Sequence, residues 1–509
     1  MSEQFDGLVI DSADNTATLL RDVVAGEVVK LSDGEIVSAV DPVAFGHKIA
    51  LKAIEKGAPV VKYGEVIGTA SRPIAKGCHV HVENVDSCRA RGDQKEEQKA
   101  AESSVKSEGA GHLVLTRPVL DARDLTFMGY PRSDGSAGTR NYVGVISCVV
   151  CANDVVSKLG EIDGVAGFTH QQGCSQTMPD VQSIANILVD LAKNPNLGAV
   201  LYVSLGCESV PSNDVLSRAA AATGKPVELI AIQKEGGLTK ALERGRQVIE
   251  AMKAKIAVDP VPVPFAKLKL GLKCGSSDTT QGLSANVIAG RITDIFAAAG
   301  ASVVMGETTE FMGAEHIAAA HCVSDEVGRT IGDKVVRMEA RARAVGVDMR
   351  GGQPTRGNIA GGLTTIEEKS LGALAKAGSA VFQRVISYGK NVEQPGLVMM
   401  DAPGREPEML TGLASAGCNL ILFTTGRGAP QGFPFVPVIK VTGNERTWQH
   451  MQEHMDCCVA SVINGQESYE AAAKRLFDAV MAYASGRKTK AEICNYNNSM
   501  NIYVTGPTI

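Results

Sequence analysis

The chain has 509 residues, and its 51 Lys and Arg against 56 Asp and Glu (51 − 56) give a net charge of −5. Hydrophobic residues make up 44% and charged residues 21%, which is the balance of a globular protein and excludes a disordered chain. The length allows about two to four domains, and a mildly acidic chain without a basic stripe excludes a nucleic-acid binder.

The apolar runs, the N-terminus and the cysteines indicate the compartment in which we expect the protein. No run of about 18 apolar residues occurs, and the N-terminus lacks the basic and apolar regions of a signal peptide, so we expect a cytoplasmic protein with no membrane partner. Because the cytosol keeps thiols reduced, the 12 cysteines favour metal ligands or catalytic thiols, with small buried side chains as the alternative. A homodimer is the default expectation for a soluble enzyme.

Residues 1–88 predict a small β-rich module. Its strand candidates are short apolar runs separated by Gly, Asp and Pro: Phe5–Ile10, Glu27–Leu31, Pro59–Tyr63 and His79–Val82. His79 and His81 share one face of a strand because strand side chains alternate, and His47 lies earlier in the module. We therefore expect these three histidines to form a site, in preference to three separately solvated side chains.

The remainder predicts a linker and two α/β domains. Residues 89–115 are dense in charge, Ser, Gly and Ala, which is the composition of a linker. Beyond it, short apolar runs alternate with amphipathic segments, which predicts parallel sheets covered on both faces and divided into domains 116–350 and 351–509. The apolar runs are Tyr142–Val150, Ala199–Leu205, Val227–Ile232, Leu268–Leu272, Ala301–Met305, Leu397–Met400 and Leu420–Phe423.

Three cysteines occupy matched positions. Cys151, Cys207 and Cys274 each follow an apolar run and precede small or polar residues. Ligands bind at the carboxyl ends of the strands in an open α/β sheet, so three such thiols can surround one metal, iron or zinc. Cys174, in the segment HQQGCSQ, is a fourth candidate.

Candidate acid–base and anion-binding side chains follow other apolar strand candidates. Glu307 comes after a strand candidate and is either a base, a ligand-orienting group or a carboxylate favoured by a helix N-terminus. The segment GNIAGGLTT is rich in backbone donors, and Arg427 in FTTGRG suits a carboxylate through its bidentate fork. Because no G-x-x-x-x-G-K-[ST] motif occurs, these segments predict a hydroxy-acid pocket and not a phosphate loop.

Together the motifs resemble one family from end to end. GYPRSDGSAGTRN, HQQGCSQ, LGCE, CGSSD, GNIAGGLTTIEEKSLG and FTTGRG follow the order found in altronate and galactarate dehydratases, and GHKIAL and HVHVEN resemble their N-terminal SAF-type module. The resemblance implies β-elimination of water from a sugar acid with a metal, giving a 2-keto-3-deoxy acid. The metal would be Fe²⁺, as a single ion or an iron–sulfur cluster, or another divalent ion.

The resemblance and the positions together assign candidate residues to roles. Metal ligands would be Cys151, Cys207 and Cys274, with Cys174 in reserve. Acid–base or ligand groups would be His47, His79 and His81, with His170, Glu208 and Glu307 as further candidates. The substrate would contact Lys48, Arg356, Asn358, Lys369, Thr425 and Arg427.

Two other functions stay open. A sulfolactate lyase would release sulfite by the same chemistry, and Arg356 stands where the family usually has proline. A metal-binding or sugar-acid-binding sensor without catalysis is the second alternative, and a closed four-ligand metal site would distinguish it.

Overall fold

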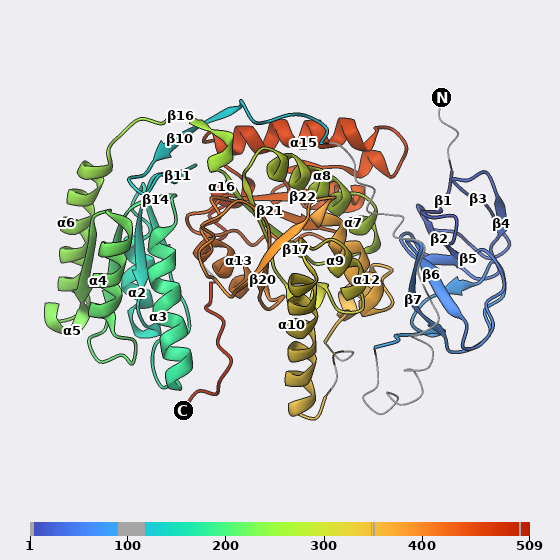
Figure 1. The fold of residues 1–509 in the computed structure, drawn as a ribbon, viewed down its shortest axis with the longest axis horizontal. Helices are drawn as coiled ribbons and strands as arrows, with labels where there is room; N and C mark the ends of the chain where they lie inside the picture. The colour runs from blue at the N-terminus through green and yellow to red at the C-terminus, as the bar shows by residue number, and fades with distance from the viewer. Residues whose placement is uncertain (1–4, 90–117, 348, 350–351, 498–499) are drawn as a thin grey trace.

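A computed structural model describes residues 5–89, 118–347, 349, 352–497 and 500–509. The chain forms a β module and two α/β domains arranged in a row (Figure 1). The module and the domain with the smaller sheet lie at opposite ends, and the C-terminal domain lies between them. Apart from Arg89, the predicted linker (residues 89–115) lies outside the described residues.

The N-terminal module consists of short strands, as expected. Its sheets have the orders β1-β2-β5-β8, β3-β4 and β6-β7-β9, all antiparallel. The strands are β1 (Gly7–Leu8), β2 (Thr16–Leu19), β3 (Val28–Lys30), β4 (Ile36–Ser38), β5 (Lys48–Ala50), β6 (Pro59–Lys62), β7 (Glu65–Ala70), β8 (His79–Val80) and β9 (Val85–Asp86).

The second domain contains a parallel four-stranded sheet of order β13-β12-β14-β15. All eight residues of β14 are buried, as in a parallel strand covered on both faces. The elements are β12 (Tyr142–Ser147), α2 (Asn153–Leu159), β13 (Val165–Phe168), α3 (Met178–Lys193), β14 (Leu197–Ser204), α4 (Ser212–Thr223), β15 (Val227–Ala231), α5 (Ile232–Glu235) and α6 (Leu238–Ile256).

The C-terminal domain contains a parallel seven-stranded sheet of order β19-β20-β18-β17-β21-β22-β23. Its strands are β17 (Lys269–Gly275), β18 (Ser302–Met305), β19 (Phe382–Ser387), β20 (Gly396–Asp401), β21 (Leu420–Thr425), β22 (Val438–Thr442) and β23 (Cys457–Cys458). Its helices are α7 (Thr279–Leu283), α8 (Ala285–Ala298), α9 (Glu315–Ala320), α10 (Asp325–Ala344), α11 (Arg356–Ala360), α12 (Ile366–Leu374), α13 (Glu406–Ser415), α14 (Glu445–His450), α15 (Tyr469–Ala484) and α16 (Lys490–Ile493).

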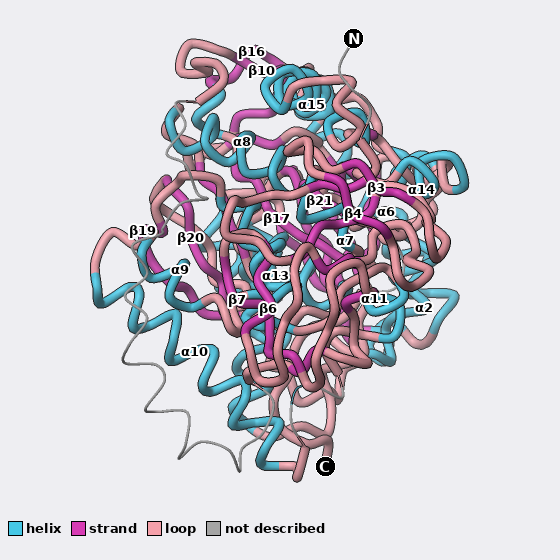
Figure 2. Tube along the Cα trace, turned by 90° about the vertical axis from the view of Figure 1, so that its right-hand side faces the viewer, coloured by secondary structure: helices cyan, strands magenta, loops and turns pink. Residues whose placement is uncertain are grey.

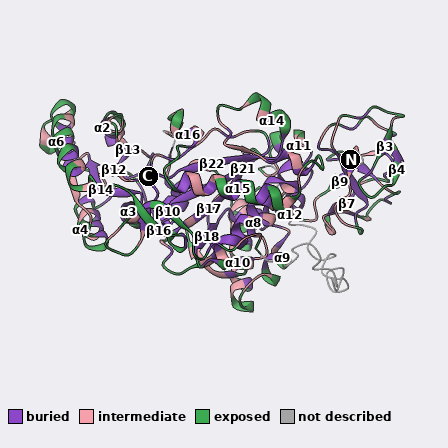
Figure 3. Ribbon diagram, turned by 90° about the horizontal axis from the view of Figure 1, so that it is seen from above, coloured by how far each residue is buried: buried purple, intermediate pink, exposed green. Residues whose placement is uncertain are grey.

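Helices cover both faces of the larger sheet. On one face α8 and α15 bury residues such as Ile292 and Leu476 against β17 and β18, and α15 begins at Ser468, whose side chain accepts a hydrogen bond from the Ala471 amide. On the other face α13 shares a hydrophobic core with α3 and the four-stranded sheet. Figure 3 shows the buried strands of both sheets between partly exposed helices.

The antiparallel strands β10 (Thr126–Pro131), β11 (Ala137–Gly138) and β16 (Val261–Pro264) form a further small sheet.

The expected α/β class with two sheets is confirmed, but the division at 350/351 is wrong. Strands before that point (β17 and β18) and after it (β19 to β23) pair in one sheet, so the sheets divide between β15 and β17. No helix in the described ranges is both long and apolar enough to cross a membrane. Figure 2, turned to face the β module, shows strands β6 and β7 in front of the C-terminal domain.

Candidate active site between the module and the C-terminal domain

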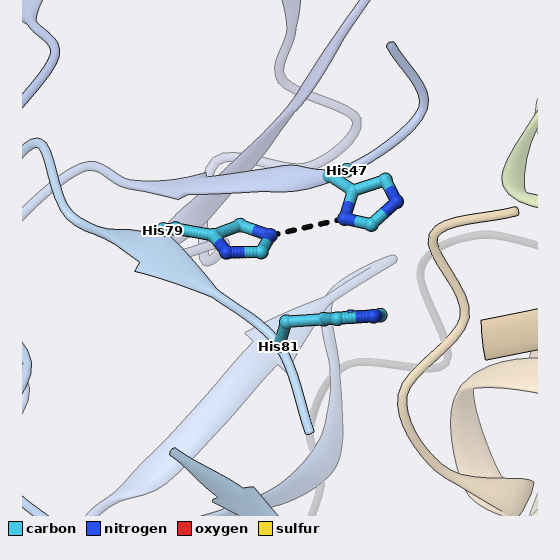
Figure 4. A group of neighbouring side chains, drawn as sticks. All are labelled: His47, His79 and His81. Carbon is cyan, nitrogen blue, oxygen red and sulfur yellow. Dashed lines mark hydrogen bonds between the residues drawn. The ribbon is translucent and has the colours of Figure 1, made fainter. Parts of the chain in front are cut away.

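The three histidines of the module come together. β5 and β8 pair antiparallel, and Val80, which stands between His79 and His81, is the partner of Lys48, the residue that follows His47. His47 Nδ1 and His79 Nε2 are 3.0 Å apart, and one nitrogen from each of the three rings lies within 4.8 Å of the others (Figure 4). The sequence expectation of a histidine site therefore agrees with the geometry, and no other group of this kind occurs among the described residues.

The surroundings of these rings favour their neutral form. Burial lowers the pKa of all three, and the pKa of His81 falls to about 3 because burial is reinforced by the Lys48 ammonium nearby. The His81 Nδ1 atom is buried without a hydrogen-bond partner in the described structure. Neutral imidazole is the form that binds a metal ion, and an unpaired buried nitrogen is a free ligand atom, so the three rings fit a divalent cation.

The histidines lie against the C-terminal domain. His47 Nε2 is 3.4 Å from the carbonyl oxygen of Ala360, the last residue of α11. Gly46 precedes His47 with a φ of 80°, and its Cα hydrogen faces the Gly361 carbonyl, where a Cβ would sit 3.5 Å from the oxygen. The site is therefore made by two parts of the chain about 300 residues apart.

A buried ion-pair cluster fixes this docking. Glu368 of α12 accepts hydrogen bonds from Lys48 at 2.9 Å and from Lys62 at 2.8 Å, and all three side chains are almost completely buried. Lys48 also donates to the Gly362 carbonyl oxygen. The predicted substrate contact for Lys48 is therefore wrong, because its ammonium is fully occupied inside the interface.

A cavity of about 470 Å³ adjoins the histidines. Gly46, which precedes His47, and Ala360, which contacts it, both line this cavity. The helices at its edge begin with hydrogen-bonding side chains: Asp278 caps α7 and Asn444 caps α14, and the two bond to each other at 2.7 Å. The full lining is Asp22, Ala44, Phe45, Gly46, Asp278, Thr280, Ala360, Gly361, Arg427, Asn444, Arg446, Thr447, His450 and Met451.

Only one of the expected substrate residues lines this cavity, namely Arg427. Lys369 lines a much smaller adjoining space that shares Asp278, and Arg356 is exposed at the start of α11, outside the lining of both. Asn358 is buried and closes the capping box of α11, while its amide donates to Ser277. Thr425 is buried and accepts a hydrogen bond from the Gly428 amide. Asn358 and Thr425 are therefore structural, which corrects their predicted role.

The expected thiol group separates into two places. Cys151, in the 3-10 helix Val150–Ala152, and Cys174 and Cys207, on loops, are exposed at the carboxyl end of the four-stranded sheet. These loops are joined by backbone hydrogen bonds, from Val150 to Gln172 and from Ser209 to Gly173. The three thiols are not among the described groups whose ligand atoms all lie within 4.8 Å, so they do not form a ready mononuclear site.

Cys274 lies in the other sheet, which corrects its place in the predicted group. Its thiol is buried, contacts Glu310 at 2.5 Å and accepts a hydrogen bond from Lys376 at 2.9 Å. Burial raises the pKa of this thiol to about 12. A protonated thiol held by a carboxylate and an ammonium is not a metal ligand in this state.

Glu307 belongs to the same buried cluster. It has a left-handed backbone (φ 64°), is 2.8 Å from Lys273, and its pKa is raised to about 7 by burial and by Glu310. It lines neither cavity described above, although it stands at the carboxyl end of β18 as predicted. A strained, coupled carboxylate at a strand end is typical of functional sites, so a role as base stays a prediction.

His170 and Glu208 shape the loops that carry the exposed thiols. His170 is fully buried, with Nε2 2.8 Å from the Ser147 carbonyl oxygen and Nδ1 accepting from the Gln172 amide. Glu208 accepts from the Gly206 amide and from Ser212. Both nitrogens of His170 are used by the backbone, so its predicted catalytic role is corrected to a structural one.

Sequence reasoning missed several polar residues of the cavity, among them Asp22, Asn444, Arg446 and His450. Asn444 and Arg446 directly follow β22, so the strand-end rule that selected the cysteines applies to them as well. Asp22 gave no such signal, because it reaches the cavity only through its contact with Arg446, 424 positions later. Asp278 was part of a quoted motif, but no role was assigned to it.

This architecture, with a β module closing over the strand-end loops of an α/β domain, defines a multidomain enzyme with a site between domains. Models of the D-galactarate/altronate dehydratase family match the chain throughout: the SAF domain matches residues 6–88, the second domain 129–257 and the C-terminal domain 265–508. The chain therefore belongs to the D-galactarate/altronate dehydratase family and is a hydro-lyase, which sets aside the sensor alternative.

Individual relatives agree with this assignment. The chain is 32% identical to the altronate dehydratase of Escherichia coli over 98% of this chain and 99% of the relative. It is 27% identical to the galactarate dehydratase (L-threo-forming) of Escherichia coli over 98% and 96%. It is also 34% identical to the (2R)-sulfolactate sulfo-lyase subunit beta of Chromohalobacter salexigens over 73% of this chain and 96% of that subunit.

We predict that Glu368→Gln destabilises the protein and releases the module. Removing one partner of a buried ion pair leaves buried charges without compensation, so the free energy of unfolding should fall by about 3–5 kcal/mol. Urea unfolding measures this loss. The matched control Glu35→Gln changes an exposed carboxylate and should stay within about 0.5 kcal/mol of wild type. If the free energy of unfolding fell by less than about 1 kcal/mol in Glu368→Gln, the ion-pair cluster would not be what holds the module in place.

Proposed function

We propose that this chain is a metal-dependent dehydratase of sugar acids that forms a 2-keto-3-deoxy acid. The observation that carries the proposal is the group of three histidines beside a cavity that Arg427 and Asp278 line. A cation at the histidines and a guanidinium in the cavity suit a hydroxy acid, whose carboxylate and α-hydroxyl need positive partners.

The residues of the cavity divide the chemistry among them. Arg427 binds the substrate carboxylate, since the described structure gives its side chain a single partner, the Gly357 carbonyl oxygen. His47, His79 and His81 would hold Fe²⁺ or another divalent cation. When bound, such a cation neutralises the carboxylate and acidifies the α-proton.

We propose Asp278 as the base that removes the α-proton. It lines the cavity, and burial raises its pKa although Thr280 and Asn444 hydrogen-bond to it. The proton moves to its carboxylate, the bond from the β-carbon to its hydroxyl breaks, and the hydroxyl leaves as water after taking up a proton. The resulting enol then ketonises to the 2-oxo acid.

The function is tested by assaying protein purified without oxygen, with and without added Fe²⁺. Altronate, galactarate and (2R)-sulfolactate serve as substrates, and 2-oxo acid and sulfite are measured together. We expect 2-oxo acid without sulfite and a loss of activity with chelator. Sulfite release would favour the second candidate, a sulfo-lyase, which rests on the similarity to the sulfolactate enzyme subunit. Absence of any 2-oxo acid would contradict the proposal.

Asp278→Asn should lower kcat by about 10²–10⁴-fold, because general base catalysis is lost. Asparagine can still accept the Gln281 amide at the start of α7, but its amide group would face the Asn444 donor, so urea unfolding of the variant is measured beside its kinetics. Since burial raises the pKa of Asp278 above 3.8, wild-type kcat/KM should fall as the pH drops through that raised value. A pH–rate profile measures this, and Asp278→Asn activity within tenfold of wild type would exclude the role.

We propose that the exposed thiols form a second iron site, separate from the histidines. Cys151, Cys174 and Cys207 offer soft ligands at one sheet edge, and a cluster needs wider ligand spacing than a single ion. Iron per chain is measured in His81→Gln, in Cys207→Ser and in the exposed control His316→Gln. We expect His81→Gln to lose the catalytic cation and Cys207→Ser to lose visible absorbance from a cluster. Full iron in both variants would exclude both assignments.

The cytoplasmic location and the homodimer stay predictions from the sequence. Sedimentation of the full chain measures the second of them directly.

A further inference from the structure

The cavity holds a second guanidinium that the mechanism above does not use. Arg446 lies on α14, and its Nη2 is 2.8 Å from a carboxylate oxygen of Asp22 in the module. Its guanidinium also lies over the Phe45 ring, 4.7 Å from the ring centre. Stacking on the ring holds the planar fork in one orientation, so Arg446 is a preorganised carboxylate-binding group.

The Asp22 carboxylate does not use the whole hydrogen-bonding capacity of the Arg446 guanidinium. Both side chains are more than half exposed (59% and 64%), and exposed ion pairs contribute little to stability. Asp22 is also held independently, by the Phe45 amide at 2.8 Å. An incoming carboxylate can therefore share or replace Asp22 on Arg446 without breaking the module.

The two arginines stand at different parts of the lining. Arg427 follows β21 next to Asp278, since a Cβ on Gly426 would meet the Asp278 carboxylate. Arg446 stands with Asp22 and Phe45 of the module. His450, one turn after Arg446, also lines the cavity, and its Nδ1 is 3.0 Å from the Arg446 carbonyl oxygen.

We propose that Arg446 binds a second anionic group of the substrate, so that this enzyme prefers hydroxy acids with an anion at both ends over those with one. The inference rests on the proposed function, because Arg427 and the histidines take the reacting carboxylate. The substrate class is an aldaric acid, with the carboxylate at its far end on Arg446. A sulfonated hydroxy acid has the same two-anion chemistry and is one arm of the test.

The experiment compares two acids of equal length, galactarate and galactonate, with (2R)-sulfolactate as a third substrate. Wild-type kcat/KM should favour galactarate by at least tenfold. Arg446→Gln should raise KM for galactarate by about 10–100-fold, the range of a lost charge-assisted hydrogen bond, with kcat within about threefold. KM for galactonate should change by less than about twofold. Arg446→Lys should restore part of the loss.

Asp22→Asn separates substrate binding from docking. This variant breaks the same ion pair but leaves the cation in place, so KM for galactarate should fall. If Arg446 only fastens the module, Asp22→Asn would instead reproduce the defect of Arg446→Gln, and the inference would be overturned. A preference for galactonate, or equal effects of Arg446→Gln on both acids, would also overturn it. Turnover of altronate but of none of these three acids would also overturn the inference, whereas no turnover of altronate either would count against the proposed function, which distinguishes the two failures.

Discussion

The carboxylate of Glu368 binds two ammonium groups of the module, one from β5 and one from β6, inside an interface that excludes water. A buried charge without partners is strongly destabilising, so this cluster fixes where the module sits on α12. Lys48 directly follows His47, and Glu368 also accepts hydrogen bonds from the Thr364 amide and hydroxyl, shortly after Gly361 and Gly362, which face Gly46. The position of the histidines relative to the cavity therefore depends on one interaction that belongs neither to the histidine group nor to the cavity lining.

The same docking sets the charge state of the site. The Lys48 ammonium, held near the histidines by Glu368, adds to burial in lowering the pKa of His81. This favours the neutral form of His81, which is the form of imidazole that binds a metal ion. The positively charged side chains of the neighbouring cavity come from the C-terminal domain, where Arg427 follows β21 and Arg446 follows β22. In the proposed function the module would supply metal-binding nitrogen, and the α/β domain the groups that bind and deprotonate an acid.

Much of the fold and part of the site could be predicted from the sequence. Continuous apolar runs identified seven strands of the two sheets, and period-2 alternation brought His79 and His81 together. The domain boundary could not be predicted, because strand order in space differs from order along the chain: β17 pairs with β18 and β21. Cys274 has the same local context as Cys151, yet its neighbours Glu310 and Lys376 come from 36 and 102 positions away. Likewise, only the docked module brings Asp22 to Arg446.

The central claim is that the module histidines hold the catalytic cation at the edge of the C-terminal cavity. Anomalous diffraction at the iron absorption edge, from crystals grown without oxygen with Fe²⁺ and a slow hydroxy-acid substrate, tests it most directly. The account predicts an iron peak within bonding distance of nitrogens from His47, His79 and His81, with the acid extending toward Arg427. Iron found only at Cys151, Cys174 and Cys207, with the histidines unliganded, would contradict it.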